Sequence, residues 1–276
     1  MSAADPRPDD PKAANRTATV AYRVRFDECG PDGLARTSAM LRYAQDVAWI
    51  HSERLGFDRD WYATRGLTWL VRAAQVTILR PVPLGTTLDV STTVAGFRKV
   101  WARRRTDGRL ADGTLAFWAH TDWVIVDARG LPTRIPAEFP EVYGTMPGPF
   151  EPGRVPLPPT PPDATVHSGV VRPQDLDPLG HVNNAAYLDY LEEALLMAGG
   201  EGAAAIVAAP RSVWLEFLVQ ATPGSTVEGS TWSDDAGAGE PATRAWRLTD
   251  EAGIELARGR HTVGMDAIDR DAGRGT

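Results

Sequence analysis

An aspartate and a histidine four positions apart are the residues of this chain best suited to chemistry. Asp177 and His181 lie in the segment 170–196, which reads VVRPQDLDPLGHVNNAAYLDYLEEALL. A carboxylate can attack a carbonyl carbon or activate water, and an imidazole can hold an oxyanion, orient the carboxylate or move a proton. The pair is therefore a candidate site for attack on a carbonyl group. The plainer alternatives are that Asp177 only forms a turn before Pro178 and that His181 is structural.

The pattern around this pair indicates a strand, then a loop, then a helix. Pro173 and the run 177–180 interrupt the strand, because proline fixes its own torsion and disfavours helix in the residue before it. Asn183 or Asn184 can cap the following helix. Residues on one face of that helix recur at helical spacing: Tyr187, Leu188, Leu191 and Leu195. The pair thus precedes a helix N-terminus, whose unpaired N–H groups and partial positive charge favour an oxyanion.

The string from Asp177 to Glu193, D-x-x-G-H-V-N-N-x-x-Y-L-x-Y-L-E-E, resembles the active-site segment of hotdog-fold thioesterases. It is similar both to the 4-hydroxybenzoyl-CoA type and to the acyl-acyl carrier protein type. The resemblance implies that Asp177 and His181 are catalytic, with Asp177 as the nucleophile or as the base for water. Asn183 and Asn184 are then supporting residues that fix the loop and can touch the substrate.

Composition narrows the class of protein. The 276 residues are 43% hydrophobic, which is enough for a substantial core in one large domain or two ordinary ones. No apolar run approaches the roughly 18 to 20 residues that a membrane-spanning helix needs. The net charge of −7 argues against a nucleic-acid-binding protein. Cys29 is the only cysteine, so no internal disulfide can form and a reducing, cytoplasmic location is expected.

The chain contains an internal duplication. The first copy has three parts in order: a strand pattern over 20–26, a helical stripe within 37–56 and β patterns over 68–126. The same order of patterns returns after a proline-rich stretch. The two copies align through these pairs: Pro31 with Pro178, Gly33 with Gly180, Tyr43 with Tyr190 and Gly85 with Gly224. We therefore expect an α+β protein, a tandem double hotdog whose halves each wrap an antiparallel sheet around a long helix and pack as a pseudo-dimer.

The predicted organisation has five parts. They are a disordered tail over 1–17, an N-terminal hotdog over 18–143, a proline-rich linker over 144–165, a C-terminal hotdog over 166–265 and a flexible tail over 266–276. The N-terminal half carries the string E-C-G-P-D-G and resembles the N-terminal half of acyl-acyl carrier protein thioesterases. We expect this half to hold the acyl group.

The alignment predicts a single active site. Asp177 falls opposite Gly30 and His181 opposite Leu34, so the first copy lacks both polar groups. Asp32 lies two positions from the aligned slot and is the alternative for a second site.

Two departures from the plant-type acyl carrier protein thioesterases affect the expected mechanism. Those enzymes have an asparagine two residues before the histidine, where this chain has Leu179, and a glutamate followed by a cysteine where it has Gln220 and Ala221. A cysteine nucleophile is therefore excluded at this site, since Cys29 lies in the other half, and Gln220 can still bind water or substrate. In related single hotdogs a glycine N–H holds the oxyanion; Gly66 occupies the comparable place, with a simple turn glycine as the alternative.

Two further groups of residues are candidates for substrate contacts. Tryptophans that can line the acyl pocket, or else pack in the core, are Trp49, Trp69, Trp118 and Trp123. A basic cluster that can steer an acidic carrier protein, or else protect an edge strand from aggregation, comprises Arg98, Lys99, Arg103, Arg104, Arg105 and Arg109.

The sequence therefore predicts a thioesterase that releases a fatty or polyketide-type acid from acyl-acyl carrier protein. An acyl-CoA thioesterase and a non-catalytic hotdog acyl-binding module are the alternatives, whereas D-P-L-G-H lacks the spacing of hotdog hydratases. The chain has no G-x-S-x-G elbow, P-loop, H-E-x-x-H or paired-cysteine motif, so no cofactor and no metal are expected. A monomer and a homodimer of double hotdogs both fit.

Overall fold

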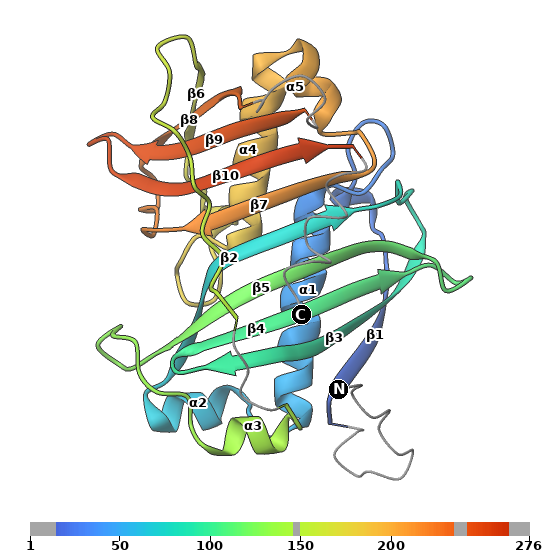
Figure 1. Cartoon of the computed structure of the whole chain (residues 1–276), viewed down its shortest axis with the longest axis vertical. Helices are drawn as coiled ribbons and strands as arrows, with labels where there is room; N and C mark the ends of the chain where they lie inside the picture. Colours follow the sequence, from blue (N-terminus) through green and yellow to red (C-terminus); the bar gives the residue numbers. More distant parts are fainter. Residues whose placement is uncertain (1–14, 146–149, 235–241, 265–276) are drawn as a thin grey trace.

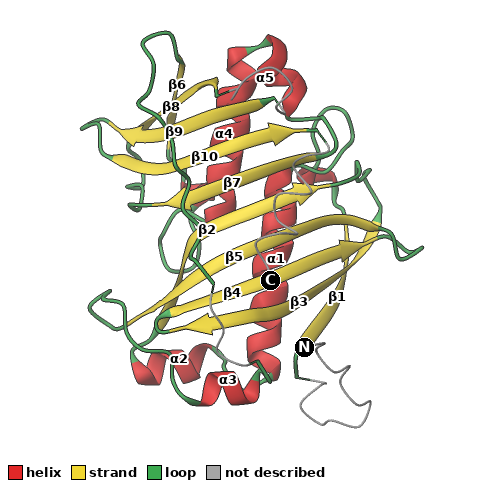
Figure 2. Cartoon of the chain, viewed as in Figure 1, coloured by secondary structure: helices red, strands yellow, loops and turns green. Residues whose placement is uncertain are grey.

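The structure is a computed structural model that describes residues 15–145, 150–234 and 242–264. A ten-stranded antiparallel sheet forms one layer, and two long helices lie against one of its faces (Figure 1, Figure 2). The strand order is β1-β3-β4-β5-β2-β7-β10-β9-β8-β6, so each half contributes five adjacent strands. The predicted α+β double hotdog is confirmed. The predicted tail over 266–276 and residues 1–14 of the other tail lie outside the described residues.

The two halves repeat one order of elements. The N-terminal half consists of β1 (Thr17–Arg23), α1 (Thr37–Arg54), α2 (Arg59–Arg65), β2 (Thr68–Ile78), β3 (Thr87–Arg98), β4 (Trp101–Arg109), β5 (Leu115–Val126) and α3 (Glu138–Val142). The C-terminal half consists of β6 (Thr165–Val170), α4 (Asn184–Ala198), α5 (Gly200–Ala205), β7 (Arg211–Phe217), β8 (Thr226–Ser233), β9 (Thr243–Asp250) and β10 (Glu255–Val263). Within the described ranges, no helix combines the length and the apolar character needed to span a membrane.

Each half buries one carboxylate beneath the turn that precedes its long helix. In the C-terminal half this carboxylate is Asp175, which accepts a 2.8 Å hydrogen bond from the Tyr190 hydroxyl and pairs with Arg172 at 3.0 Å. The N-terminal half repeats the arrangement with its own three residues: Arg25, Glu28 and Tyr43. Because charged hydrogen bonds and a buried phenol fix the turn in both halves, the duplication extends from the sequence to the side-chain contacts.

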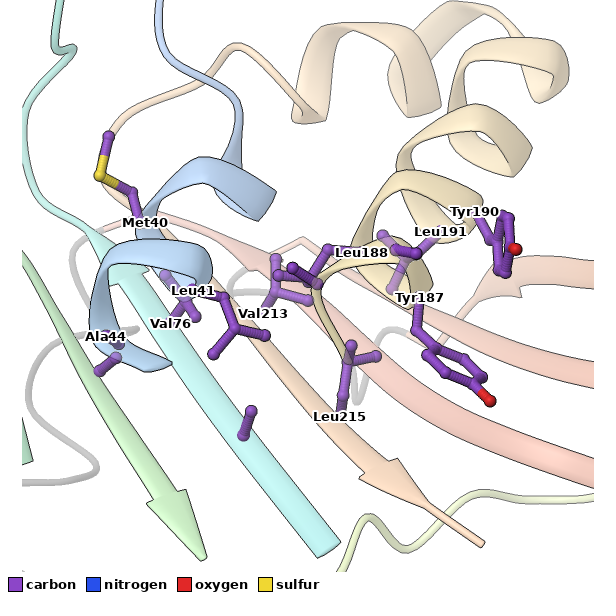
Figure 3. Close-up of a cluster of buried hydrophobic side chains, with 14 of the residues drawn as sticks. Met40, Leu41, Ala44, Val76, Tyr187, Leu188, Tyr190, Leu191, Val213 and Leu215 are labelled. Carbon is purple, nitrogen blue, oxygen red and sulfur yellow. The ribbon is translucent and has the colours of Figure 1, made fainter. Parts of the chain in front are cut away.

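The two halves share one hydrophobic core where α1 and α4 cross the middle of the sheet. β2 pairs with β7, and Val76 lies opposite Val213 in the register. Figure 3 shows Leu41 of α1 and Leu188 of α4 beside these strands, and all four side chains are buried. Separating the halves would expose this apolar surface to water, so the shared core favours folding as one unit.

Residues 150–164 form neither helix nor strand and cross the outer face of the sheet, away from the long helices (Figure 1). Side chains of the sheet hold this linker through its backbone. Asp122 accepts from the N–H of Gly153 at 2.5 Å, Glu216 accepts from the N–H of Val155 at 3.0 Å, and Arg103 donates to Glu151 O at 2.9 Å. Asp122 lies in the N-terminal half and Glu216 in the C-terminal half, so the linker contacts both.

The packing of β4 predicts a stability change at Gly108. A Cβ added there would lie 2.0 Å from the ring of Phe117, which is fully buried. We expect Gly108→Ala to lower the free energy of unfolding by about 1–3 kcal/mol, as overpacking does, when measured by urea unfolding. Gly169→Ala on β6 is the matched control, because an added Cβ there meets nothing within 4 Å. Equal losses in the two variants would contradict this packing.

Candidate active site

Asp177 and His181 lie in a tight turn before α4. Asp177 Oδ1 accepts hydrogen bonds from the N–H groups of Leu179 at 2.8 Å and His181 at 3.1 Å. The Asp177 N–H donates to His181 O at 2.7 Å, and Gly180 has a φ of 76°, a left-handed conformation that suits glycine. Neither Asp177 Oδ2 nor the His181 ring has a hydrogen bond to any described residue. Both groups are therefore available to water or substrate.

The matching turn of the N-terminal half has the same backbone hydrogen bond but lacks the carboxylate and the imidazole. Its Gly30 N–H donates to Leu34 O at 2.9 Å, as the Asp177 N–H does to His181 O. Asp32 Oδ1 accepts from the Leu34 N–H at 3.0 Å. The side chains opposite the catalytic candidates are thus a hydrogen atom and a leucine, as the alignment predicts.

The N-terminus of α4 leaves one backbone donor free. Asn183 caps the helix, because its Oδ1 accepts from the N–H of Ala185 at 2.9 Å. The N–H of Asn184, the first helical residue, has no acceptor among the described residues. In the N-terminal half the matching N–H belongs to Thr37 and donates to Glu192 Oε1 at 3.3 Å. Of the two long helices, only α4 therefore offers this N–H to an oxyanion.

Gln45 of α1 ties the N-terminus of α4 to the other half. Its Nε2 donates to Asn183 Oδ1 at 3.4 Å, and its Oε1 accepts from Asn184 Nδ2 at 3.0 Å. Gln45 was not among the residues predicted for the site. The alignment contains the signal, because Gln45 falls opposite Glu192, which makes the corresponding contact to α1.

A cavity of about 940 Å³ opens beside the turn and is lined by both halves. The C-terminal half contributes apolar residues such as Phe217 and Leu218 together with these polar groups: Asp177, His181, Asn183, Asn184 and Gln220. The N-terminal half contributes mainly apolar walls: Leu67, Trp69, Val94, Phe97, Trp123 and Phe139. The cavity therefore joins the predicted reacting groups to a surface suited to a hydrocarbon chain.

Three of the four predicted pocket tryptophans line this cavity. Trp49 is 43% exposed, while Trp69 and Trp123 are half-buried. Trp118 does not line it, so that prediction is wrong. Its ring packs against His120 and under the guanidinium of Arg105, away from the cavity.

Gly66 is not available as an oxyanion donor. It ends α2 in the left-handed conformation, with φ of 59°, and its N–H donates to Ala63 O at 3.2 Å. It does not line the cavity. The alternative of a structural glycine therefore fits the structure.

The predicted basic cluster does not form one free surface. Arg98 and Arg103 hold the linker, with Arg98 donating to Phe150 O at 2.8 Å, and Arg105 pairs with Asp107 at 2.6 Å. Lys99 and Arg109 are exposed. Arg104 is buried and lines the cavity. The expectation that Arg104 contacts a carrier protein is therefore wrong, because side chains along a strand alternate between two faces and Arg104 points to the helix side.

Tyr187 lines the cavity, a position that its place on the apolar face of the helix did not predict. It also packs in the core as expected, and its hydroxyl oxygen accepts from the N–H of Ala221 at 3.1 Å. Burial raises the pKa of this phenol, so the group keeps its proton. Tyr187 thereby fixes the segment that carries Gln220 to the helix that follows the catalytic turn.

The single thiol of the chain is not placed for catalysis. Cys29 is buried, its thiol donates to Arg25 O at 3.4 Å, and burial raises its pKa. No cluster of three or more His, Cys, Asp or Glu side chains suited to a metal occurs in the described part of the chain.

His51 of α1, which contacts the cavity residue Arg104, makes the free energy of unfolding depend on pH. Burial, and then the charge of Arg104, lower its pKa from 6.5 to about 4, so the folded state binds this proton less readily than the unfolded state. Stability is therefore lost as the pH falls from about 6.5 to about 4, by roughly 3 kcal/mol for this residue. We expect His51→Gln to lose less stability across this window, measured by chemical unfolding at each pH. Parallel curves for the two proteins would contradict the assignment.

The cap of α4 predicts different effects for the two asparagines. Asn183→Ala removes the cap, so we expect a loss of about 1 kcal/mol in the free energy of unfolding. Asn184→Ala removes one hydrogen bond to Gln45 and adds a strong helix former, so we expect a smaller loss. Urea unfolding of both variants measures the difference, and an equal or reversed order would show that Asn183 is not the cap that stabilises α4.

Comparison with known proteins agrees with this geometry. The profile of the acyl-ACP thioesterase N-terminal domain matches residues 15–143, and that of the thioesterase-like superfamily matches residues 171–232. The chain is 26% identical over 262 residues to a palmitoyl-acyl carrier protein thioesterase of Cuphea hookeriana, and 25% identical over 256 residues to an acyl-acyl carrier protein hydrolase of Cuphea viscosissima. Both matches cover 87% of this chain, which spans 60% of the length of either relative.

Solved structures share the fold over nearly the whole chain. An acyl-ACP thioesterase from Bacteroides thetaiotaomicron superposes with a TM-score of 0.74 at 14% identity, covering 92% of this chain and 99% of that one. A 12:0-ACP thioesterase from Umbellularia californica gives 0.72 at 21% identity, covering 89% and 93%. The predicted resemblance is thus confirmed: the chain is a double hotdog whose residues 15–143 match the acyl-ACP thioesterase N-terminal domain and whose residues 171–232 match the thioesterase-like superfamily.

Proposed function

We propose that this chain hydrolyses acyl thioesters at the Asp177 turn and that an acyl carrier protein delivers the acyl group. One observation carries the proposal: the turn opens, beside a free helix N-terminus, onto a cavity whose apolar walls come mainly from the other half. The relatives over 87% of the chain are thioesterases or hydrolases of acyl carrier protein substrates, which supports this choice of carrier.

The site offers a role for each group. A thioester carbonyl at the N-terminus of α4 would direct its oxygen to the Asn184 N–H, where the helix dipole stabilises the developing negative charge. Asp177 then either attacks the carbonyl carbon, forming an anhydride that water opens, or takes a proton from an attacking water. In either route the thiolate leaves, and His181 can protonate it. Gln220 can position the water.

Arg59, beside the cavity, is a better candidate for a contact with the carrier than the predicted basic cluster. Arg59 lines the cavity, is exposed and has no hydrogen bond or ion pair to any described residue. By contrast, Arg42 pairs with Asp189 at 2.8 Å. A phosphate on the arm that brings the thioester would pair with Arg59. Carrier protein and CoA both have such a phosphate, so this contact fits either carrier.

The alternatives differ in what they require of the site. An acyl-CoA thioesterase would use the same groups and differ only in the carrier. A non-catalytic acyl-binding module would use the cavity but would not need the open Oδ2 of Asp177 or the free ring of His181. A cytoplasmic location, and a monomer or homodimer of double hotdogs, stay predictions from the sequence.

Asp177→Asn tests the proposal with the turn preserved, because an amide oxygen can still accept the two N–H bonds. We expect free-thiol release from acyl carrier protein and CoA thioesters to fall by at least about 100-fold in kcat. Asp32→Asn is the matched control in the other turn and should keep wild-type activity. Preference of the wild type for one carrier decides between the two thioesterase alternatives.

Two results would contradict the proposal. The first is unchanged turnover by Asp177→Asn. The second is absence of turnover by the wild type while the same thioesters bind equally well to both proteins, which would favour the binding module.

A further inference from the structure

The inner part of the cavity contains a buried cation. Arg104 of β4 is 7% exposed and lines the cavity together with Ser52 of α1 and Tyr143. Its neighbours on the strand, Arg103 and Arg105, lie on the other face of the sheet, where Arg103 contacts the linker and Arg105 contacts Trp118. Arg104 thus places a guanidinium among the otherwise mainly apolar walls of the N-terminal half.

The hydrogen-bond partners of Arg104 are all neutral. Its Nη1 contacts His51 Nδ1 at 3.1 Å, and its Nη2 donates to Ser52 Oγ at 3.1 Å and to the Tyr143 hydroxyl at 3.3 Å. His51 Nε2 donates to Asn15 O at 2.8 Å, so its Nδ1 carries the lone pair that accepts from Arg104. The positive charge is therefore shared with no anion in this network.

No carboxylate among the described residues balances this charge. Arg104 forms no ion pair with Asp or Glu within the described ranges, whereas Arg103 on the same strand pairs with Asp122 at 2.7 Å. The Tyr143 ring lies 5.3 Å from the guanidinium carbon and offers a cation–π contact. A buried charge without an opposite charge is costly, which makes the inner cavity a poor site for a plain alkyl end.

We propose that the acyl group of the substrate ends in a carboxylate that pairs with Arg104. Guanidinium binds carboxylate through two parallel hydrogen bonds, and burial strengthens the pair because little water competes. The apolar walls between the two ends, including Phe97 and Phe139, would contact the methylene chain. This inference rests on the proposed thioesterase function and deepens it by naming the substrate class as ω-carboxyacyl thioesters.

The spacing along α1 fits two polar ends joined by a chain. Gln45 contacts the asparagines at the reacting end, and Ser52 contacts Arg104 at the inner end. The two residues are seven positions apart, which is about 10 Å along a helix axis. A single extended acyl chain can therefore reach from the catalytic turn to the guanidinium.

Selectivity between chain ends tests the proposal. We would measure kcat/KM for ω-carboxyacyl, ω-hydroxyacyl and unsubstituted acyl thioesters of equal chain length on one carrier, over several lengths. We expect the wild type to prefer the ω-carboxyacyl thioester at least tenfold at its best length, and Arg104→Gln to lose that preference. Arg105→Gln, on the same strand and the opposite face, should keep it.

Binding separates this inference from hydrolysis. Calorimetry of ω-carboxyacyl and unsubstituted acyl analogues on one carrier, each with a methylene between sulfur and carbonyl carbon, should show tighter binding of the ω-carboxyacyl analogue to Asp177→Asn than to Asp177→Asn with Arg104→Gln. Arg104→Lys, which keeps the charge, should retain part of the preference and serves if Arg104→Gln fails to fold. Equal affinity for the two analogues, a preference for the ω-hydroxyacyl thioester, or a preference that Arg104→Gln leaves unchanged would overturn the proposal, whether or not the protein hydrolyses any thioester.

Discussion

The pairing of β2 with β7 is the interaction on which the rest of the structure depends. It joins two five-stranded sheets into one and brings α1 and α4 side by side over the seam. Because of that contact, Gln45 on α1 can hold the N-terminus of α4, and both halves line one cavity. The Asp177 turn comes from the C-terminal half, and most of the apolar wall comes from the N-terminal half.

The duplication also explains why one site is expected. The two long helices contact each other's N-termini through the same register position, occupied by Gln45 in α1 and Glu192 in α4. Glu192 is 8% exposed, burial raises its pKa, and it accepts the Thr37 N–H that would otherwise be open. The neutral Gln45 leaves the equivalent Asn184 N–H free. Glu192 therefore makes a structural contact with the N-terminus of α1, whereas Gln45 leaves the N-terminus of α4 open as a candidate oxyanion site.

Much of this arrangement follows from the sequence, because its causes are local. The Asp177 turn, the cap at Asn183 and the duplicated order of elements depend on short-range patterns, and each lies where those patterns indicate. The errors at Trp118 and Arg104 share one cause. Alternation along a strand separates its residues into two faces but does not say which face meets the helices. The two readings of Gly66 could not be separated from the sequence, because α2, which uses its N–H, is too short to give a periodic pattern.

A crystal structure of the chain with a non-hydrolysable substrate analogue, in which a methylene separates the sulfur from the carbonyl carbon, would show directly whether one site spans both halves. We expect one analogue per chain, with the carbonyl oxygen at the Asn184 N–H and the acyl chain running between α1 and the sheet toward Arg104. An acyl chain bound within the C-terminal half beneath α5, or a second analogue beside the turn at Gly30, would contradict it.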